Sequence, residues 1–556
     1  MIRTKITSSL EKSFIDANID EYKRLDKISA LLGERLSLQL LYTYEDDSER
    51  FSRLEVRPVF EGALASYVKL HNVGYVPVIN PVQYDSCDDN YISKRPGLYP
   101  DVLTPLSSHE SIFIHRGTLD SLWIEINIPE DGKDIIGDGC LKVSLVRTDN
   151  GAVVAEETVD ITVIGATLPA QRLIFTQWLY ADCIADVHGV EMFSERHFEL
   201  IARYIEVAVR NGINMILTPV FTPPLDTEVG GERPTCQLVE VYKSERGYRF
   251  GYKLLDRWLD MCNSLGVKYF EISHLFTQWG ATHAPKIMAH TDGGYKRIFG
   301  WDTDAHGSEY ARFLKSFLRS FIKHMKRRGE DGRIYFHISD EPSASQLQDY
   351  KRSKRIVAGI LKDYPIIDAL SSFDFYKAGV AKRPIPASNH IEPFLEAKVP
   401  DLWTYYCCTQ SKDVSNRFIA MPSCRTRAIG MQMYKYGICG FLHWGYNFYY
   451  NRYSLNLINP YLDTTGEKWV PAGDTHSVYP APNGCLESIR LLVFFEAITD
   501  MRAMELCESL LGKERVVKEI EDALGRTVVF SECPRTPSEI HAVRERINAL
   551  VAEGCK

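Results

Sequence analysis

The residues best suited to chemistry in this sequence are two adjacent carboxylates, Asp340 and Glu341, in the segment FHISDEPS at residues 336–343. The apolar residues before them predict a strand, which Pro342 ends because proline has no amide hydrogen to give to a sheet. Neighbouring side chains inside a strand point to opposite faces, but where the strand ends the backbone turns and both can enter one pocket. The alternative is an ordinary Asp-Glu cap before a helix.

Adjacency restricts the acid–base reaction that such a pair could perform. Two carboxylates in one poorly solvated site take different pKa values, so one stays protonated while the other is ionised. Most glycoside hydrolases place their carboxylates on opposite sides of the bond they cleave, and consecutive residues are too close together for that. The pair instead suits substrate-assisted hydrolysis, in which the oxygen of a 2-acetamido group on the sugar attacks the anomeric carbon. One carboxylate then orients the acetamido group, and the other protonates the leaving oxygen and later activates water.

Further candidates for sugar binding follow the expected strands. Trp279 and Trp444 offer aromatic faces for a pyranose ring, although core packing is an alternative for Trp279. His274 could donate to a sugar hydroxyl or could be a buried structural histidine. The full set of candidate substrate-binding residues is His274, Trp279, Tyr376, Tyr405, Asn416, Trp444 and Asn447.

The elements that must position these residues alternate between strand and helix after about residue 168. The expected strands are 172–180, 213–220, 267–275, 333–339, 366–376, 401–407, 417–421 and 438–445. Eight β/α units predict a (β/α)8 TIM barrel; the alternative is an open doubly wound sheet, but no glycine-rich nucleotide loop follows any strand. The longest connections, 221–250, 276–306 and 446–484, each follow a strand and so belong to the active-site face of a barrel.

The first part of the chain has a different pattern, with short β segments separated by turn-forming residues. The segment Asp149-Asn150-Gly151, which lies between two apolar runs, predicts a hairpin. Many short strands with few helices are typical of a β-sandwich. We therefore expect an α/β protein with an N-terminal β-sandwich domain over residues 1–168, a barrel catalytic domain over 169–515 and a helical extension packed on the barrel over 516–556.

Composition limits the classes of partner and cofactor. The 556 residues are 45% hydrophobic and 25% charged, with a net charge of −8 and no basic stripe, so we expect no nucleic-acid partner. No apolar run reaches the roughly 18–20 residues of a membrane span. The 13 cysteines are scattered without a CxxC pair, which predicts reduced thiols and no metal cluster. With no apolar leader at the N-terminus we expect a cytoplasmic protein, and the sequence leaves a homo-oligomer open.

Several segments resemble glycoside hydrolase family 123, the β-N-acetylgalactosaminidase family, and its uncharacterised relatives. They are LWIEINIP (122–129), FEISHLFTQWGATHAPKI (270–287), FHISDEPS (336–343), NRFIAMPS (416–423) with the following Arg425, and YGICGFLHWGYNFY (436–449). The resemblance spans most of the chain. It implies a retaining enzyme without metal or organic cofactor, a glycan or glycoconjugate substrate, Asp340 as the residue that orients the acetamido group and Glu341 as the acid/base. The alternatives are a related barrel glycosidase with another sugar specificity and a non-catalytic glycan-binding protein.

Overall fold

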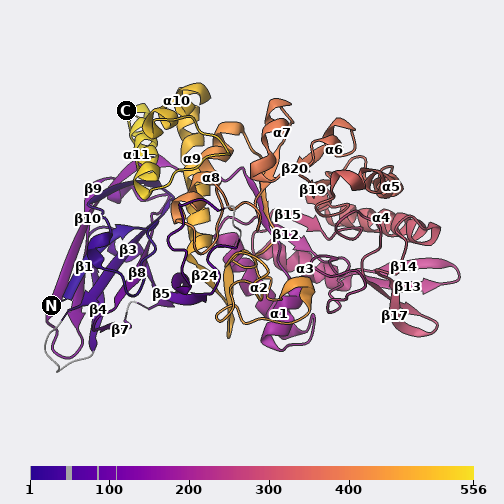
Figure 1. Ribbon diagram of the computed structural model, residues 1–556, viewed down its shortest axis with the longest axis horizontal. Helices are drawn as coiled ribbons and strands as arrows, with labels where there is room; N and C mark the ends of the chain where they lie inside the picture. Colours follow the sequence, from indigo (N-terminus) through magenta and orange to yellow (C-terminus); the bar gives the residue numbers. More distant parts are fainter. Residues whose placement is uncertain (1, 46–52, 84–86, 108, 556) are drawn as a thin grey trace.

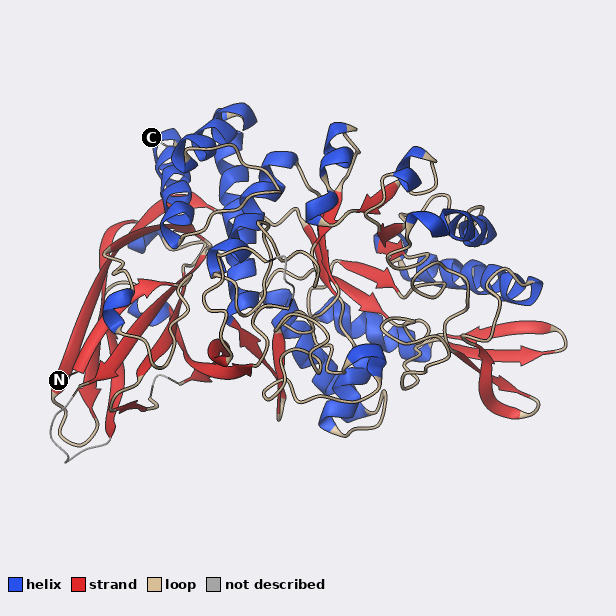
Figure 2. Ribbon diagram, viewed as in Figure 1, coloured by secondary structure: helices blue, strands red, loops and turns tan. Residues whose placement is uncertain are grey.

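The computed structural model describes residues 2–45, 53–83, 87–107 and 109–555. The chain forms a mixed α/β molecule with a sheet-rich N-terminal region at one end and alternating strands and helices at the other (Figures 1 and 2). No helix within these ranges is both long enough and apolar enough to cross a membrane.

Two sheets form the N-terminal region. In spatial order, the larger holds β1 (Ile2–Ser8), β3 (Arg35–Tyr44), β8 (Leu119–Asn127), β5 (Val68–Val78), β6 (Gly97–Leu106), β24 (Gly484–Ser488) and β23 (Val478–Ala481). The smaller holds β2 (Lys27–Leu32), β10 (Val153–Thr167), β9 (Gly137–Arg147), β4 (Arg53–Glu61) and β7 (Ile112–His115). Because β23 and β24 come from the far end of the chain, the larger sheet depends on residues long after the N-terminal region.

The two sheets share one hydrophobic core, and the sequence pattern explains it. In β10, Val159, Ile161 and Val163 are buried while Asp160 between them is exposed. This alternation is that of a strand with one face on a core. Residues of both sheets contribute to the same apolar cluster, so the sheets pack face to face.

Short parallel strands organise the rest of the chain. They are β11 (Ile174–Gln177), β12 (Met215–Thr218), β15 (Tyr269–Ile272), β18 (Ile334–Phe336), β19 (Ile367–Ala369), β20 (Arg383–Ile385), β21 (Trp403–Tyr405) and β22 (Gly440–His443). Six of them form one curled sheet in the order β18-β15-β12-β11-β22-β21, and β19 pairs with β20. Single parallel bridges, Phe336 to Ile366 and Ala387 to Tyr405, connect this pair to β18 and to β21.

Helices separate these strands along the chain. They are α1 (Ala181–His188), α2 (Glu195–Arg210), α3 (Lys253–Ser264), α4 (Ser308–Arg328), α5 (Leu347–Val357), α6 (Asp374–Lys377), α7 (Glu392–Glu396), α8 (Ser423–Tyr436) and α9 (Ile489–Leu511). The connections after β12 and β15 also carry a small sheet of β14 (Gly247–Gly251), β13 (Glu240–Ser244), β16 (Ile287–Thr291) and β17 (Gly294–Phe299). It lies at the end of the molecule opposite the N-terminus (Figure 1).

Among the parallel strands, one expected strand is wrong, and one observed strand was not predicted. Residues 417–421 have no strand structure, although Phe418, Ile419, Ala420 and Met421 are almost fully buried. These apolar side chains are buried beneath other loops. The Ile419 amide donates to the Ala472 carbonyl at 2.9 Å, and the carbonyls of Ile419 and Met421 accept from the buried Lys12. The additional strand is β20, which lies between residues 376 and 401, where no strand was expected.

The C-terminal helices are α10 (Lys513–Leu524) and α11 (Pro537–Gly554), and α11 packs between the N-terminal sheets and the helices α8 and α9. Helix α11 contacts α8 and α9 on one side and β2 and β10 on the other. On the second side the Glu545 carboxylate accepts from the Ser29 amide at 2.9 Å and from its hydroxyl at 2.6 Å. The end of the chain is yellow beside the indigo and purple strands in Figure 1.

A buried ion pair joins the N-terminal sheet to α9 and gives a stability prediction. Asp101 of β6 accepts from Arg490 at 2.8 and 2.9 Å, and neither side chain has solvent access. Asp101→Asn leaves the guanidinium buried without its counter-charge, so we expect the free energy of unfolding to fall by about 3–5 kcal/mol. Urea unfolding followed by circular dichroism measures it. The exposed pair Arg203–Glu206 supplies the control, Glu206→Gln, for which we expect a change of about 0.5 kcal/mol or less; equal effects of the two substitutions would contradict the prediction.

Candidate active site

Asp340 and Glu341 both open into one cavity of about 190 Å³ just after the end of β18. The cavity lies at the carboxyl ends of the parallel strands. Its walls are formed by Trp178, Asp226, Gln278, Trp279, Asp340, Glu341, Ala369, Tyr405, Cys407, Cys408, Leu442, Trp444, Trp469 and Val470. The sequence candidates that the structure brings together here are therefore the two carboxylates, Trp279, Tyr405 and Trp444.

A turn of the backbone brings the two neighbouring carboxylates to the same cavity. Glu341 has a φ of +42°, in the left-handed region that a residue with a β-carbon adopts only at a cost. Its amide donates to the Ala369 carbonyl at 3.1 Å, and the Asp340 carbonyl accepts from the Trp279 amide at 3.0 Å. Asp226 and Trp279 also have positive φ values, of 50° and 56°. Three residues that line this cavity therefore have a strained backbone, as is common at functional sites.

The carboxyl groups in the cavity hold their protons more tightly than usual. Burial raises the pKa of Asp340 well above its ordinary value, and the negative charges of Glu341 and Asp226 raise it further. Burial also raises the pKa of Glu341, although the residue reaches the surface at the cavity mouth. The Tyr405 hydroxyl opposes this by donating to Glu341 Oε1 at 2.6 Å, because a hydrogen bond to the carboxylate favours its ionised form.

Asp226 is a third carboxylate in the cavity that the sequence analysis missed. It lies in the long connection after β12, and burial raises its pKa to about 7, with a smaller contribution from the charge of Glu341. Its amide donates to the side chain of Gln278, another lining residue. A long connection after a strand was the only signal that pointed to this region, and no motif marked this residue within it.

Indole rings form much of the cavity wall. Trp279 is 40% exposed, whereas Trp178 is fully buried. The rings of Trp444 and Trp469 meet with their centroids 5.5 Å apart. Flat aromatic surfaces beside carboxyl groups can bind a pyranose, because the C–H faces of the sugar pack on aromatic rings and its hydroxyls form hydrogen bonds with polar groups.

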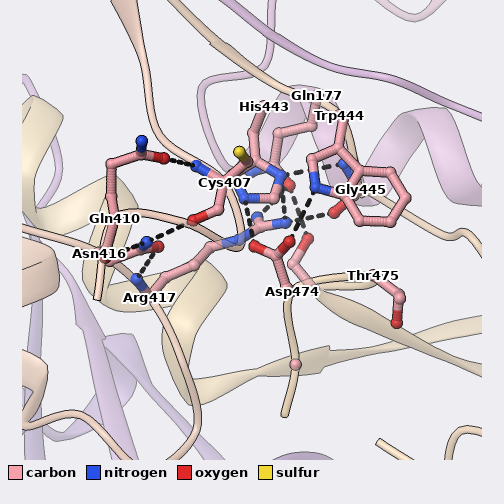
Figure 3. A network of polar contacts seen from close by, with 12 residues as sticks. Gln177, Cys407, Gln410, Asn416, Arg417, His443, Trp444, Gly445, Asp474 and Thr475 are labelled. Carbon is pink, nitrogen blue, oxygen red and sulfur yellow. Dashed lines mark hydrogen bonds and ion pairs between the residues drawn. The ribbon is translucent and has the colours of Figure 1, made fainter. Parts of the chain in front are cut away.

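A polar network behind the cavity fixes Trp444 (Figure 3). Its indole N–H donates to Asp474 Oδ2 at 2.9 Å, and burial raises the pKa of Asp474 to about 7. His443 Nε2 lies 3.3 Å from the other oxygen of Asp474, and its Nδ1 accepts from Arg417 at 2.8 Å. Asn416 belongs to the same network: its amide nitrogen donates to the carbonyls of Cys407 and Gln410, both at 2.8 Å. Asn416 therefore holds backbone and does not line the cavity.

The remaining candidates have other contacts and do not line the cavity. Asn447 holds the backbone of Tyr180, accepting from its amide at 2.9 Å and donating to its carbonyl at 3.0 Å. Tyr376 stacks on Phe373, with ring centroids 5.7 Å apart. His274 is buried below the cavity, and burial lowers its pKa well below the usual value.

His274 belongs to a stacked histidine pair beneath the carboxylates. Its ring lies on that of His337, with centroids 4.2 Å apart. His337 Nε2 lies 2.6 Å from Glu271 and its Nδ1 3.4 Å from Asp368. Burial alone would lower the pKa of His337, but its hydrogen bonds to the two carboxylates raise it to about 9. Asp368 also accepts from the Ile338 amide at 2.8 Å, so this layer fixes the strand end that carries Asp340.

The chain matches one protein-family model and resembles a solved structure over its whole length. The family model for the catalytic domain of glycoside hydrolase 123 matches residues 178–507. A family 123 glycoside hydrolase from Clostridium perfringens, studied for glycolipid glycan hydrolysis, has a similar structure, with a TM-score of 0.73, 15% identity and coverage of 100% of this chain and 98% of that chain. At that identity the likeness shows the fold alone.

Other solved structures are more distant. β-Glucuronidase 2 from Bacteroides uniformis has a TM-score of 0.26 and 11% identity, over 86% of this chain and 48% of that chain. A family 5 mannosidase from Rhizomucor miehei has a TM-score of 0.32 and 15% identity, over 60% of this chain and 93% of that chain. No curated protein sequence matches the chain.

Proposed function

The chain belongs to glycoside hydrolase family 123, and from this membership and the geometry of the cavity we propose that it is a retaining, substrate-assisted hydrolase. Its substrate is a terminal β-linked 2-acetamido sugar, N-acetylgalactosamine, on a glycan or glycoconjugate. The Clostridium relative, whose structural study concerns glycolipid glycans, makes a glycolipid one candidate for the conjugate.

The observation that carries this proposal is that two consecutive carboxylates share one small cavity. Consecutive residues cannot stand on opposite sides of a glycosidic bond, so the sugar supplies the nucleophile from its own acetamido group. Asp340 accepts from the acetamido N–H and stabilises the positive charge that develops as the ring closes. Glu341 protonates the leaving oxygen and then activates the water that opens the cyclic intermediate.

Electrostatics supports a pair with one protonated and one ionised carboxyl group, which is the state that this mechanism requires. An acid catalyst must hold a proton near neutral pH, and burial raises the pKa of Glu341 in that direction. Tyr405 occupies one oxygen of Glu341, which leaves Oε2 to carry the proton toward the leaving group. Because the negative charge of Glu341 raises the pKa of Asp340, the pair favours the state in which only one member is ionised.

We extend the proposal to the architecture. The parallel strands β11 to β22, with the two single bridges that connect β19 and β20 to their neighbours, form a closed (β/α)8 barrel over residues 169–515. A β-sandwich domain over residues 1–168 precedes it, and a helical extension over 516–556 follows. In such a barrel the carboxyl ends of the strands form the catalytic face, which is where Asp340 and Glu341 lie.

Asp226 supports one alternative, a related glycosidase with another sugar specificity. It comes from a different strand end than Glu341, lines the same cavity and has a pKa of about 7. Asp226 and Glu341 could then act from two sides of the bond, and the sugar would need no acetamido group.

An assay with matched aryl glycosides separates the two functions. We expect aryl β-N-acetylgalactosaminide to be hydrolysed, and aryl β-galactoside, which lacks the internal nucleophile, to have a kcat/KM lower by on the order of 10³-fold or more. Proton NMR should show the β-anomer of the released sugar first. Comparable rates with both glycosides would favour the pair Asp226 and Glu341, and first release of the α-anomer would contradict retention.

A further inference from the structure

A second cavity of about 280 Å³ lies beside the first. Its lining residues are Asp226, Trp279, Arg452, Tyr453 and Trp469. Asp226, Trp279 and Trp469 also line the first cavity, so the two spaces share a wall. A molecule whose terminal sugar fills the first cavity can therefore extend into the second, with its glycosidic bond between them.

The arginine of the second cavity, Arg452, is exposed and packs on its neighbour Tyr453. Arg452 lies over the Tyr453 ring, with its guanidinium carbon 4.7 Å from the ring centroid, and its Nη2 donates to the Tyr453 hydroxyl at 3.0 Å. None of the ion pairs between described residues includes Arg452. Since a guanidinium has five N–H donors, most of them remain free to bind a ligand.

The loop that presents Arg452 is held in a strained and fixed conformation. Tyr453 and Ser454 have φ values of 62° and 57°, in the left-handed region. Asn451 ties the loop together, with its side-chain oxygen accepting from the Asn456 amide at 2.8 Å and its nitrogen donating to Glu467 at 2.7 Å. The Ser454 hydroxyl donates to the Asp226 carbonyl at 2.8 Å, which joins this loop to the active cavity. Strain that the surroundings maintain is characteristic of ligand-binding segments.

We propose that the second cavity is the subsite for the leaving part of the substrate, and that Arg452 selects a sugar there that carries an anionic group. This inference rests on the proposed glycoside hydrolase function. A neutral sugar could pack on Trp279 and Tyr453 without any charge, whereas the free guanidinium is the group that binds carboxylate or sulfate oxygens through paired N–H donors.

Binding of three disaccharide analogues to the intact protein tests this. Each has N-acetylgalactosamine joined through sulfur, which resists hydrolysis, to the same second sugar in neutral, carboxylated or sulfated form. By calorimetry we expect at least one acidic form to bind about tenfold more tightly than the neutral one. Arg452→Gln should remove that preference, and Arg246→Ala, an exposed arginine in the turn between β13 and β14, should retain it.

Each result decides the inference. A preference for the carboxylated or the sulfated analogue alone identifies the group, and a preference for both assigns a general anion site. Equal binding of the three analogues, or a preference that survives Arg452→Gln, overturns the inference. Since the analogues are not cleaved, failure of the wild-type protein to hydrolyse the aryl glycoside would contradict only the proposed function.

Discussion

Glu341→Gln is expected to lower kcat/KM for an aryl β-N-acetylgalactosaminide by about 10³-fold, within the range that general acid–base catalysis contributes. Glutamine keeps the size of the side chain and can still accept from Tyr405, but it has no proton to give to the leaving oxygen. The loss should shrink with aryl groups that leave easily, because a stable phenolate needs little protonation. Initial rates with a nitrophenyl and a dinitrophenyl glycoside measure both effects.

The pH dependence of the same rate identifies the group that supplies the proton. Loss of the proton from Glu341 produces the alkaline limb of the kcat/KM profile, so this limb should disappear in Glu341→Gln. The hydrogen bond from Tyr405 favours the ionised form of Glu341 and so lowers the pKa of this residue. Tyr405→Phe removes that hydrogen bond. The substitution should therefore raise the pKa of Glu341 and move the alkaline limb to higher pH.

A glutamate outside the cavity provides the control for both variants. Glu396→Gln, on the exposed side of α7, should keep the wild-type rate and profile. A Glu341→Gln protein with undiminished activity would remove this residue from the acid/base role. A Tyr405→Phe profile that moves to lower pH would mean that the limb belongs to another group.

The sequence predicted the parts of this molecule that repeat a simple physical pattern. Short β segments between turn-forming residues located strands such as β10, and the proline after the carboxylates placed Asp340 and Glu341 close to a strand end. Membership in family 123 is confirmed by the family match. Trp444, at the end of an apolar strand, lines the cavity as its position suggested.

The parts that escaped prediction depend on contacts distant in sequence. Residues 417–421 are apolar because other loops cover them, and periodicity cannot distinguish such burial from a strand. Asp226 and Trp469 reach the cavity from long connections whose paths no local pattern specifies. Asn416 and Asn447 stand at the expected positions, but their amides hold the backbone. Residue type and position indicated polar groups near the site without indicating what each would bind.

The role of Asp340 is tested by substitutions that distinguish its carboxylate from that of Asp226. If Asp340 orients the acetamido group, Asp340→Asn should lower kcat/KM by about 10²–10³-fold, as removal of a group that stabilises transition-state charge does. It should also weaken a thiazoline inhibitor that mimics the cyclised acetamido intermediate, because the asparagine carries no negative charge to meet the ring nitrogen. Rates and inhibition constants with the aryl glycoside measure both effects.

Asp226→Asn separates substrate assistance from the alternative mechanism. The substitution should leave thiazoline inhibition within about threefold of wild type, since the proposed mechanism assigns the acetamido group to Asp340 and not to Asp226. If Asp226→Asn abolished hydrolysis while Asp340→Asn kept both activity and thiazoline binding, the two reacting carboxylates would be Asp226 and Glu341, on separate strand ends. The adjacency of Asp340 and Glu341 would then be a structural feature of the strand end, and the need for a 2-acetamido sugar would disappear with it.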